Sequence, residues 1–210
     1  MEQMPCTMHP LFATLAKQDT VRYRRTFQAM KSSHTTESDP DAVRWDAVEE
    51  AAELLLQRNP RDALYLLRTV VRNDPRNPYA YYYIGASMLE VGRFDEAVDA
   101  YKAALRLSPR YLAARIGLSH AVRISGEPTL AMEHAQRALE QCPGDGDALF
   151  ALGLALAAGG DKIGAVRTLH ACLAAHPELE VTLEAQAMLE RLGPVEEDEP
   201  DDDACSDEIE

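Results

Sequence analysis

Alanine, proline and glycine recur in this chain at a fixed interval of 34 residues, and this period constrains the fold more than any other feature. The recurring positions are Ala63, Ala97, Ala131 and Ala165, then Pro75, Pro109, Pro143 and Pro177, and the turn glycines Gly92, Gly126 and Gly160. A period of this length is typical of a helical repeat array. Such arrays usually bind other proteins rather than transform small molecules, because each repeat extends a long groove and few repeats enclose a pocket.

The period divides the chain into an array with an extension at each end. The predicted repeats are 44–77, 78–111, 112–145 and 146–179, followed by an amphipathic capping helix over 180–192. An N-terminal segment, 1–31, and a polar linker, 32–43, precede the array, and an acidic tail that we expect to be disordered, 193–210, follows it.

Local chemistry agrees with two helices in each repeat. In the second repeat, Tyr81, Ile84 and Met88 lie at helical spacing on one face, and Gly85 leaves room for a second helix to approach. The turn glycines suit the left-handed conformation that ends a helix, and the recurrent prolines stop each second helix. Pro60 and Pro128 stand where second helices are expected to begin.

Charge and composition narrow the class of partner. The net charge is −14, but residues 196–210 hold ten acidic side chains and no basic one, so the other 195 residues net only −4. Without a broad basic surface, nucleic acid is not expected as the partner. The N-terminal residues are not expected to form a signal sequence, no apolar stretch approaches 18 residues, and the four cysteines are scattered. These features favour reduced thiols, cytoplasmic residence and no membrane insertion.

The repeat resembles the tetratricopeptide repeat family, whose 34-residue helix-turn-helix unit has small residues at positions 8, 20 and 27 and proline at position 32. Position 8 is held here by Ala51, Gly85, Ser119 and Gly153. The resemblance implies an all-α, right-handed α-solenoid of four helix pairs plus the capping helix. The first repeat departs most, with Glu50 at a normally apolar position and Arg58 in place of the turn glycine.

In that family the first helix of each repeat lines a concave groove through its positions 2, 5, 9, 12 and 13. Carried over by position, the protein-binding residues expected in this chain are Tyr79, Tyr82, Leu89, Ile116, His120, Arg123, Phe150 and Leu154, with Trp45, Val48 and Leu55 in the first repeat. Their apolar and aromatic character favours an apolar or amphipathic segment of another protein as the occupant. Relatives that grip chaperone C-termini need several basic groups on these faces, and this list has only Arg123, so that role is disfavoured.

The leading hypothesis is therefore a non-enzymatic adaptor or assembly chaperone that binds a protein or peptide. The alternative is a self-assembling scaffold subunit of a larger cytoplasmic machine, a homo-oligomer formed through the repeat ends or the N-terminal segment. That segment, with Leu11, Phe12 and Leu15, could also lie in the groove of its own or a neighbouring molecule. Cys172 and His176 share a helix face, but no second pair accompanies them, so no metal, cofactor or catalytic residue is expected.

Overall fold

The computed structural model describes residues 40–194, which form ten α-helices, α2 to α11. Their bounds are α2 Pro40–Asp46, α3 Glu49–Leu56, α4 Pro60–Asn73, α5 Pro78–Glu90, α6 Phe94–Leu107, α7 Leu112–Ile124, α8 Pro128–Gln141, α9 Gly146–Ala158, α10 Lys162–Ala174 and α11 Leu179–Leu192. The predictions for segment 1–31 and for residues 195–210 of the acidic tail lie outside the described residues.

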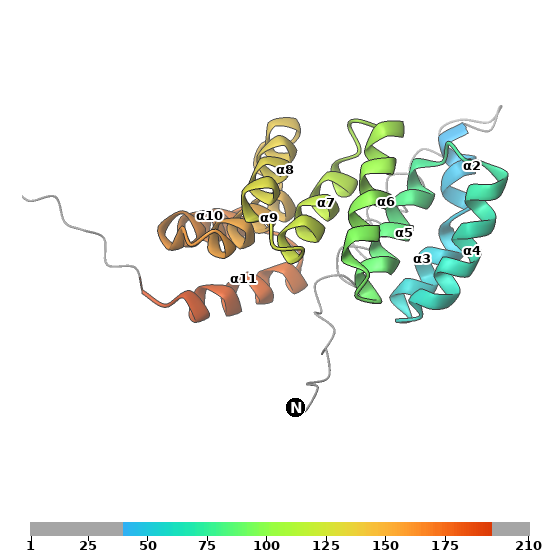
Figure 1. The fold of residues 1–210 in the computed structure, drawn as a ribbon. Coiled ribbons are helices and arrows are strands. Elements are labelled where there is room, and N and C mark those ends of the chain that lie inside the picture. Colours follow the sequence, from blue (N-terminus) through green and yellow to red (C-terminus); the bar gives the residue numbers. More distant parts are fainter. Residues whose placement is uncertain (1–39, 195–210) are drawn as a thin grey trace, which may run out of the picture.

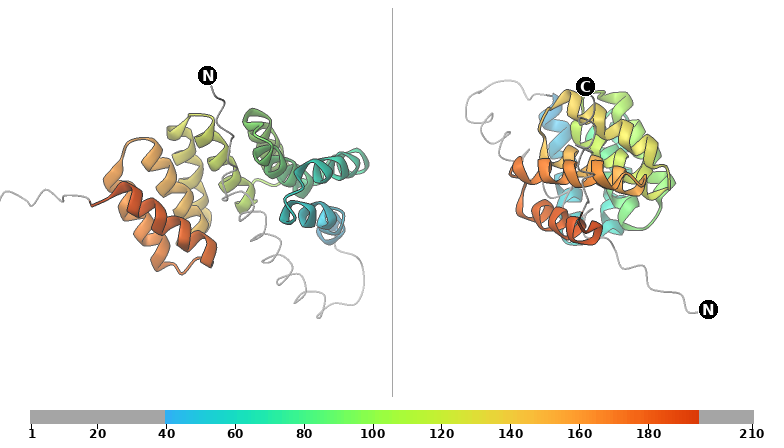
Figure 2. Two further views of the ribbon diagram at one scale, coloured as in Figure 1. Left: turned by 90° about the horizontal axis from the view of Figure 1, so that it is seen from below. Right: turned by 90° about the vertical axis from the view of Figure 1, so that its left-hand side faces the viewer.

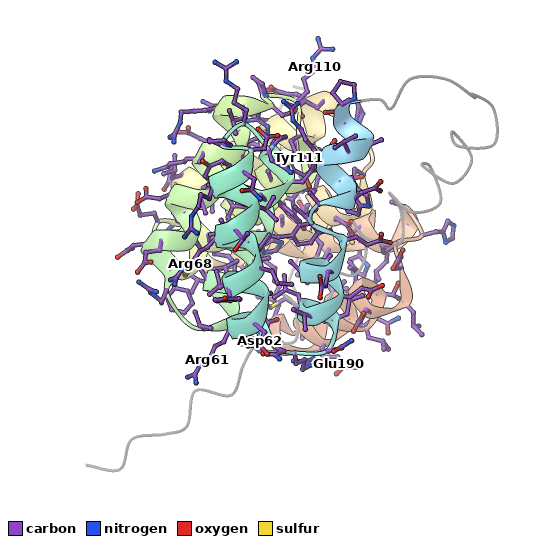
Figure 3. All side chains as sticks on the ribbon, turned by 90° about the vertical axis from the view of Figure 1, so that its right-hand side faces the viewer. Arg61, Asp62, Arg68, Arg110, Tyr111 and Glu190 are labelled. Atoms are coloured by element: carbon purple, nitrogen blue, oxygen red, sulfur yellow. The ribbon has the colours of Figure 1, made fainter. Side chains whose placement is uncertain are left out.

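The helices follow one another through space in sequence order, from α2 at one end to α11 at the other (Figure 1). Each helix packs on the next, and α3, α5, α7, α9 and α11 also contact one another in turn. These first helices form one layer, and α4, α6, α8 and α10 form the other (Figure 2). Charged side chains of α4 such as Arg61 and Arg68 point outward from it (Figure 3). The predicted all-α solenoid is confirmed.

The turns follow the chemistry that the period predicted. Gly92, Gly126 and Gly160 have φ angles of 77°, 91° and 88°, in the left-handed region where a side chain would be strained. Helices α4, α6 and α8 end two residues before their recurrent prolines, and α10 ends three residues before Pro177. Helices α4 and α8 begin at Pro60 and Pro128, where a missing N–H leaves no hydrogen bond unmade.

Glycines also permit the close contact between the second and third repeats. The ring of Tyr101 on α6 lies between Gly85 on α5 and Gly117 on α7. A Cβ atom built on these glycines would come within 2.9 Å and 2.7 Å of the ring, respectively. The predicted role of Gly85 in helix approach is therefore confirmed, and Gly117 serves the same purpose from the next repeat.

The hydrophobic core is divided into three clusters of unequal make-up. The largest extends from α2 to α9 and contains the aromatic side chains Trp45, Tyr82, Tyr83 and Tyr101. A second, around Phe150 and Leu169, joins α9, α10 and α11. Between them, the third cluster links α7, α8 and α9 through one isoleucine and four buried alanines, Ile116, Ala135, Ala138, Ala148 and Ala151.

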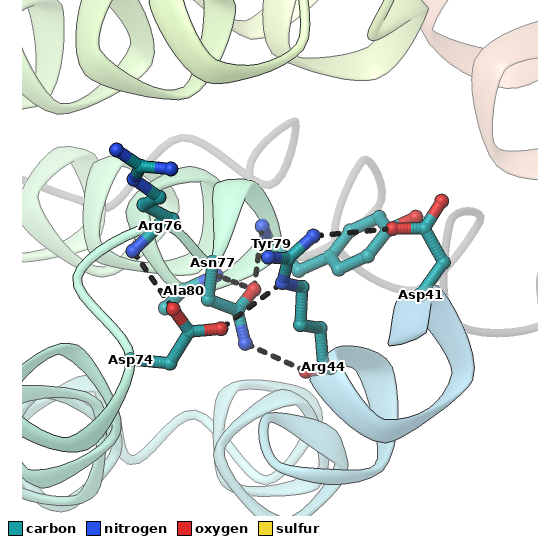
Figure 4. Close-up of polar contacts among 7 residues, drawn as sticks. All are labelled: Asp41, Arg44, Asp74, Arg76, Asn77, Tyr79 and Ala80. Atoms are coloured by element: carbon teal, nitrogen blue, oxygen red, sulfur yellow. Dashed lines mark hydrogen bonds and ion pairs between the residues drawn. The ribbon is translucent and has the colours of Figure 1, made fainter. Parts of the chain in front are cut away.

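Asn77 fastens the first repeat to the second. This residue is fully buried between α4 and α5, and its Nδ2 donates to the carbonyl oxygen of Arg44, 2.7 Å away (Figure 4). Its Oδ1 accepts from the backbone N–H groups of Tyr79 at 3.0 Å and Ala80 at 3.2 Å. Beside it, Arg44 Nε donates to Asp74 Oδ2 at 3.0 Å, and the pKa of Asp74 is lowered, first by the backbone N–H of Arg76 and then by Arg44.

The first repeat departs from the others where the sequence does. Its first helix is interrupted at Ala47 and Val48, which separate α2 from α3. Arg58 takes a φ angle of 57°, the left-handed conformation that glycine holds at the equivalent turns. A residue with a Cβ pays about 1–2 kcal/mol for this conformation.

Replacing Arg58 with glycine should therefore stabilise the protein. We expect Arg58→Gly to raise the free energy of unfolding by about 1 kcal/mol, measured by urea denaturation. Arg58→Ala is the matched control, because it removes the same charge but keeps the strained backbone. An equal gain from alanine would show that the charge, and not the backbone conformation, limits stability.

Candidate functional site: the concave surface

The concave surface of the array begins with a chain of aromatic rings that crosses the first two repeats. Trp45 of α2 meets Tyr79 of α5 edge-on, with ring centroids 5.5 Å apart, and Tyr79 meets Tyr111 at 5.4 Å. Tyr111, in the turn before α7, also contacts Tyr82 at 5.2 Å. The structure thus brings the expected binding residues Tyr79 and Tyr82 together through a tyrosine that the repeat pattern did not identify.

Tyr111 stands at the position from which Asn77 and Asp145 cap the first helices of the second and fourth repeats. The equivalent residues Asn77 and Asp145 accept hydrogen bonds from the first-turn N–H groups of α5 and α9. Tyr111 makes no side-chain cap to α7. The chain forgoes a capping bond there, and its ring instead joins the aromatic cluster.

The surface continues through the third and fourth repeats. His120 of α7 and Phe150 of α9 face one another with ring centroids 6.4 Å apart. Phe150 and Leu154 share a core cluster with Val181 of α11, whereas Ile116 belongs to the alanine-rich cluster between α7 and α9. Leu89 packs in the large cluster around the tyrosines. The expected residues therefore fall into three adjoining groups.

Most of the expected binding residues are buried. Tyr82 and His120 are 1% exposed, and Leu89, Ile116, Phe150 and Leu154 are each 3% exposed. Tyr79 and Arg123 are partly exposed. A partner therefore cannot contact most of these side chains unless the concave surface first becomes accessible.

Helix α11 adds residues that sequence reasoning missed. Continuing the 34-residue period past 179 places Val181, Glu184 and Met188 at the positions of Asp147, Phe150 and Leu154. Val181 is buried and Met188 is packed against the same cluster. The 34-residue period contains this signal, but the prediction of a capping helix does not use it.

Three ionisable side chains stand at groove positions on different helices. Burial raises the pKa of Glu90 on α5, although Arg58 opposes the shift, and burial lowers the pKa of Arg123 on α7. Burial, with the neighbouring Glu180, raises the pKa of Glu184 to about 7. Among the described residues, Glu90 Oε2 and Arg123 Nε have no hydrogen-bond partner. The groove therefore offers both signs of charge within an otherwise apolar surface.

Glu184 should make stability depend on pH. A carboxyl whose pKa is higher in the folded than in the unfolded chain stabilises the fold at low pH, and this contribution is lost as the pH rises through about 7. We expect Glu184→Gln to stabilise the protein near pH 8 and to change little near pH 4, measured by urea unfolding. Glu190→Gln, on the exposed side of the same helix, is the control and should show no such dependence. A pH-independent effect of Glu184→Gln would contradict the assignment.

The thiol of Cys172 is part of the packing. It is buried, lies 3.2 Å from the carbonyl oxygen of Gly146, and has its pKa raised to about 12 by burial and nearby carboxylates. It therefore stays protonated, whereas zinc binds the thiolate. Within residues 40–194, no three His, Cys, Asp or Glu side chains gather as a metal site, and no helix is long and apolar enough to cross a membrane.

Paired helices that follow one another in sequence order, each packed on the next, define the class of α-solenoid scaffolds. Sequence profiles of the tetratricopeptide repeat match residues 48–109, 85–146 and 147–178, so the chain belongs to the tetratricopeptide repeat family. Arrays of this family are protein-interaction scaffolds and are typically non-catalytic.

Solved structures with the same fold come from several proteins. TTC0263 of Thermus thermophilus superposes with a TM-score of 0.62 at 24% identity, over 71% of this chain and 80% of that one. MamA of Desulfovibrio magneticus RS-1 gives 0.57 at 19% identity, over 74% and 87%. A protein called YrrB gives 0.57 at 16% identity, over 85% and 88%. At these identities the likeness shows the fold alone.

Proposed function

We propose that this chain is a non-enzymatic, cytoplasmic adaptor or assembly chaperone that binds an apolar or amphipathic segment of a partner protein in its concave groove. The observation that carries the proposal is the line of aromatic and aliphatic side chains from Trp45 through Tyr82 and Phe150 to Val181. Rigid aromatic side chains are favoured anchors at protein interfaces. The similar structure of YrrB is described as having an unusual peptide-binding site, which agrees with this use of the fold.

The proposed contacts are Tyr79, Tyr82, Leu89, Ile116, His120, Arg123, Phe150 and Leu154, together with Val181 and Met188 of α11. Glu90 and Arg123 would orient the occupant, because a buried charge gains most from a partner of opposite sign. An amphipathic segment with a basic group near Glu90 and an acidic group near Arg123 fits this pattern.

The test of this proposal must avoid the buried rings, since substitutions at Tyr82 or Phe150 would disturb packing as well as binding. Arg123 and Ala157 are partly exposed and lie at equivalent groove positions of α7 and α9. We expect the double variant Arg123→Glu, Ala157→Glu to lose a partner that the unchanged protein captures from native cell extract, with helicity preserved in circular dichroism.

The matched control places the same substitutions on the outer helices, at the exposed residues Arg106 and Ala171. This control should retain the partner. If both double variants capture the partner equally, the groove is not the binding site. If no form of the protein captures a partner, the adaptor role is wrong.

The self-assembling scaffold remains the second candidate because α11 leaves apolar side chains uncovered. Leu179 is 74% exposed and Leu183 is 55% exposed, one helical turn apart at the end of the array. A second copy could cover this face, as the next repeat would in a longer array. Light scattering over a range of concentrations tests it: a constant monomer mass dismisses this candidate, and a dimer lost in Leu179→Glu, Leu183→Glu supports it.

A further inference from the structure

Parts of α5 and α7 are buried on every side, which the solenoid alone does not explain. Residues 85–90 of α5 and 116–122 of α7 are all buried, without an exposed position in either run. Successive residues of a helix are about 100° apart, so six in a row cover the whole circumference. The outer helix α4, by contrast, has an exposed face that includes Arg61, Tyr65 and Arg68.

The described neighbours cover only part of this circumference. Helix α5 packs on α3, α4, α6 and α7, which are its neighbours within the array. In a solenoid the concave side of a first helix stays open unless something lies in the groove. The low exposure of Tyr82, Ala86 and Leu89 therefore indicates that this side of α5 is covered.

We propose that the N-terminal segment, residues 8–31, occupies the concave groove of its own chain and that a partner must displace it. Occupancy is argued from the burial of α5 and α7 and from the composition of the segment, and displacement rests on the function proposed above. The segment would act as a built-in competitor for the groove.

Composition favours this segment over the acidic tail. Residues 8–31 include Leu11, Phe12, Leu15, Phe27 and Met30, which match an apolar groove. Residues 195–210 offer only Val195 and Ile209 as large aliphatic side chains among ten carboxylates. The segment also carries Arg22, Arg24 and Arg25, whose charge complements the buried carboxylate of Glu90.

The linker between the N-terminal segment and α2 is long enough for the segment to reach the groove. Residues 32–39 span up to about 28 Å when extended, and a helix such as α5 is about 20 Å long. The chain enters the array at α2, whose Trp45 packs on Tyr79 at the start of the aromatic surface. The segment can therefore turn back into the groove from either end of α5.

Self-occupancy would weaken partner binding in proportion to the fraction of molecules whose groove is open, because only that fraction can bind. A partner would then need an apolar segment that binds better than residues 8–31, or a means of withdrawing them.

The test compares the full chain with the full-length variant Leu11→Asp, Phe12→Asp, Leu15→Asp. Its matched control, Ser32→Asp, Ser33→Asp, Thr35→Asp, adds the same charge in the linker. We expect the first variant alone to bind several-fold more 1-anilinonaphthalene-8-sulfonate and to allow nitration of Tyr82 by tetranitromethane. Addition of a synthetic peptide of residues 8–31 should reverse both effects. If circular dichroism shows lost helicity, Phe12→Gln replaces the triple variant.

The possible results of this experiment distinguish the N-terminal segment from the other candidate occupants of the groove. Unchanged dye binding and nitration would overturn the proposal, and so would an equal rise when Val195→Asp, Ile209→Asp is made in the tail. A dimer that the first variant converts to monomers would assign the groove to a second copy, which also overturns it. None of these measurements needs a partner protein. The adaptor role can therefore be wrong while self-occupancy is right, and self-occupancy can be wrong while the adaptor role is right.

Discussion

Gly117→Ala is expected to destabilise this protein by about 2–3 kcal/mol, although the substitution adds a single methyl group and would normally favour a helix. The added Cβ would lie 2.7 Å from the ring of Tyr101, which is already held by Gly85 on its other side. The ring cannot move away, so either α6 or α7 must shift. Urea denaturation followed by circular dichroism measures the loss.

Replacing the ring of Tyr101 tests whether its contact with the added methyl group causes the loss of stability. In a Tyr101→Leu background the methyl group gains room, so Gly117→Ala should cost much less there, whereas Tyr101→Phe keeps the contacting ring atoms and should give no relief. An equal cost in all three backgrounds would show that Tyr101 is not the obstacle.

Asn77→Ala should cost about 2–4 kcal/mol, because it removes a helix cap and leaves the carbonyl oxygen of Arg44 without its buried donor. Asn59→Ala is the matched control. Asn59 also caps a helix, accepting from the N–H of Asp62, but at an exposed site, and should cost about 1 kcal/mol or less.

We also expect the loss of stability in Asn77→Ala to be local. Hydrogen exchange should rise first in α2, because Asn77 joins this helix to the second repeat through the carbonyl oxygen of Arg44 (Figure 4). Uniform exchange across the array, or equal costs for Asn77→Ala and Asn59→Ala, would contradict the role assigned to Asn77.

The fold could be predicted because its determinants repeat. Ala63, Ala97, Ala131 and Ala165 are all fully buried in the structure, as small residues at a helix contact should be. The interruption between α2 and α3 follows no such pattern. It belongs to the repeat whose sequence departs most from the period, so the pattern of the other repeats does not predict it.

The sequence predicts on which helix each concave residue lies, but it does not predict how exposed the side chain is. Position within the repeat determines which way Tyr82 or His120 points, and that much is periodic. Their burial depends on what else lies against the concave side, which a 34-residue pattern cannot encode. Tyr111 was missed for a related reason, since it lies in a turn and contacts Tyr79 and Tyr82 only after the helices assemble.

The alanine-rich cluster between α7, α8 and α9 makes the array mechanically uneven. Alanine buries far less apolar area than an aromatic ring, so this joint contributes less free energy than the tyrosine-filled joint around Tyr101. In a linear array each joint must hold by itself. Small side chains leave few interlocking contacts to resist bending, so a bend at this cluster would most easily change the curvature of the array.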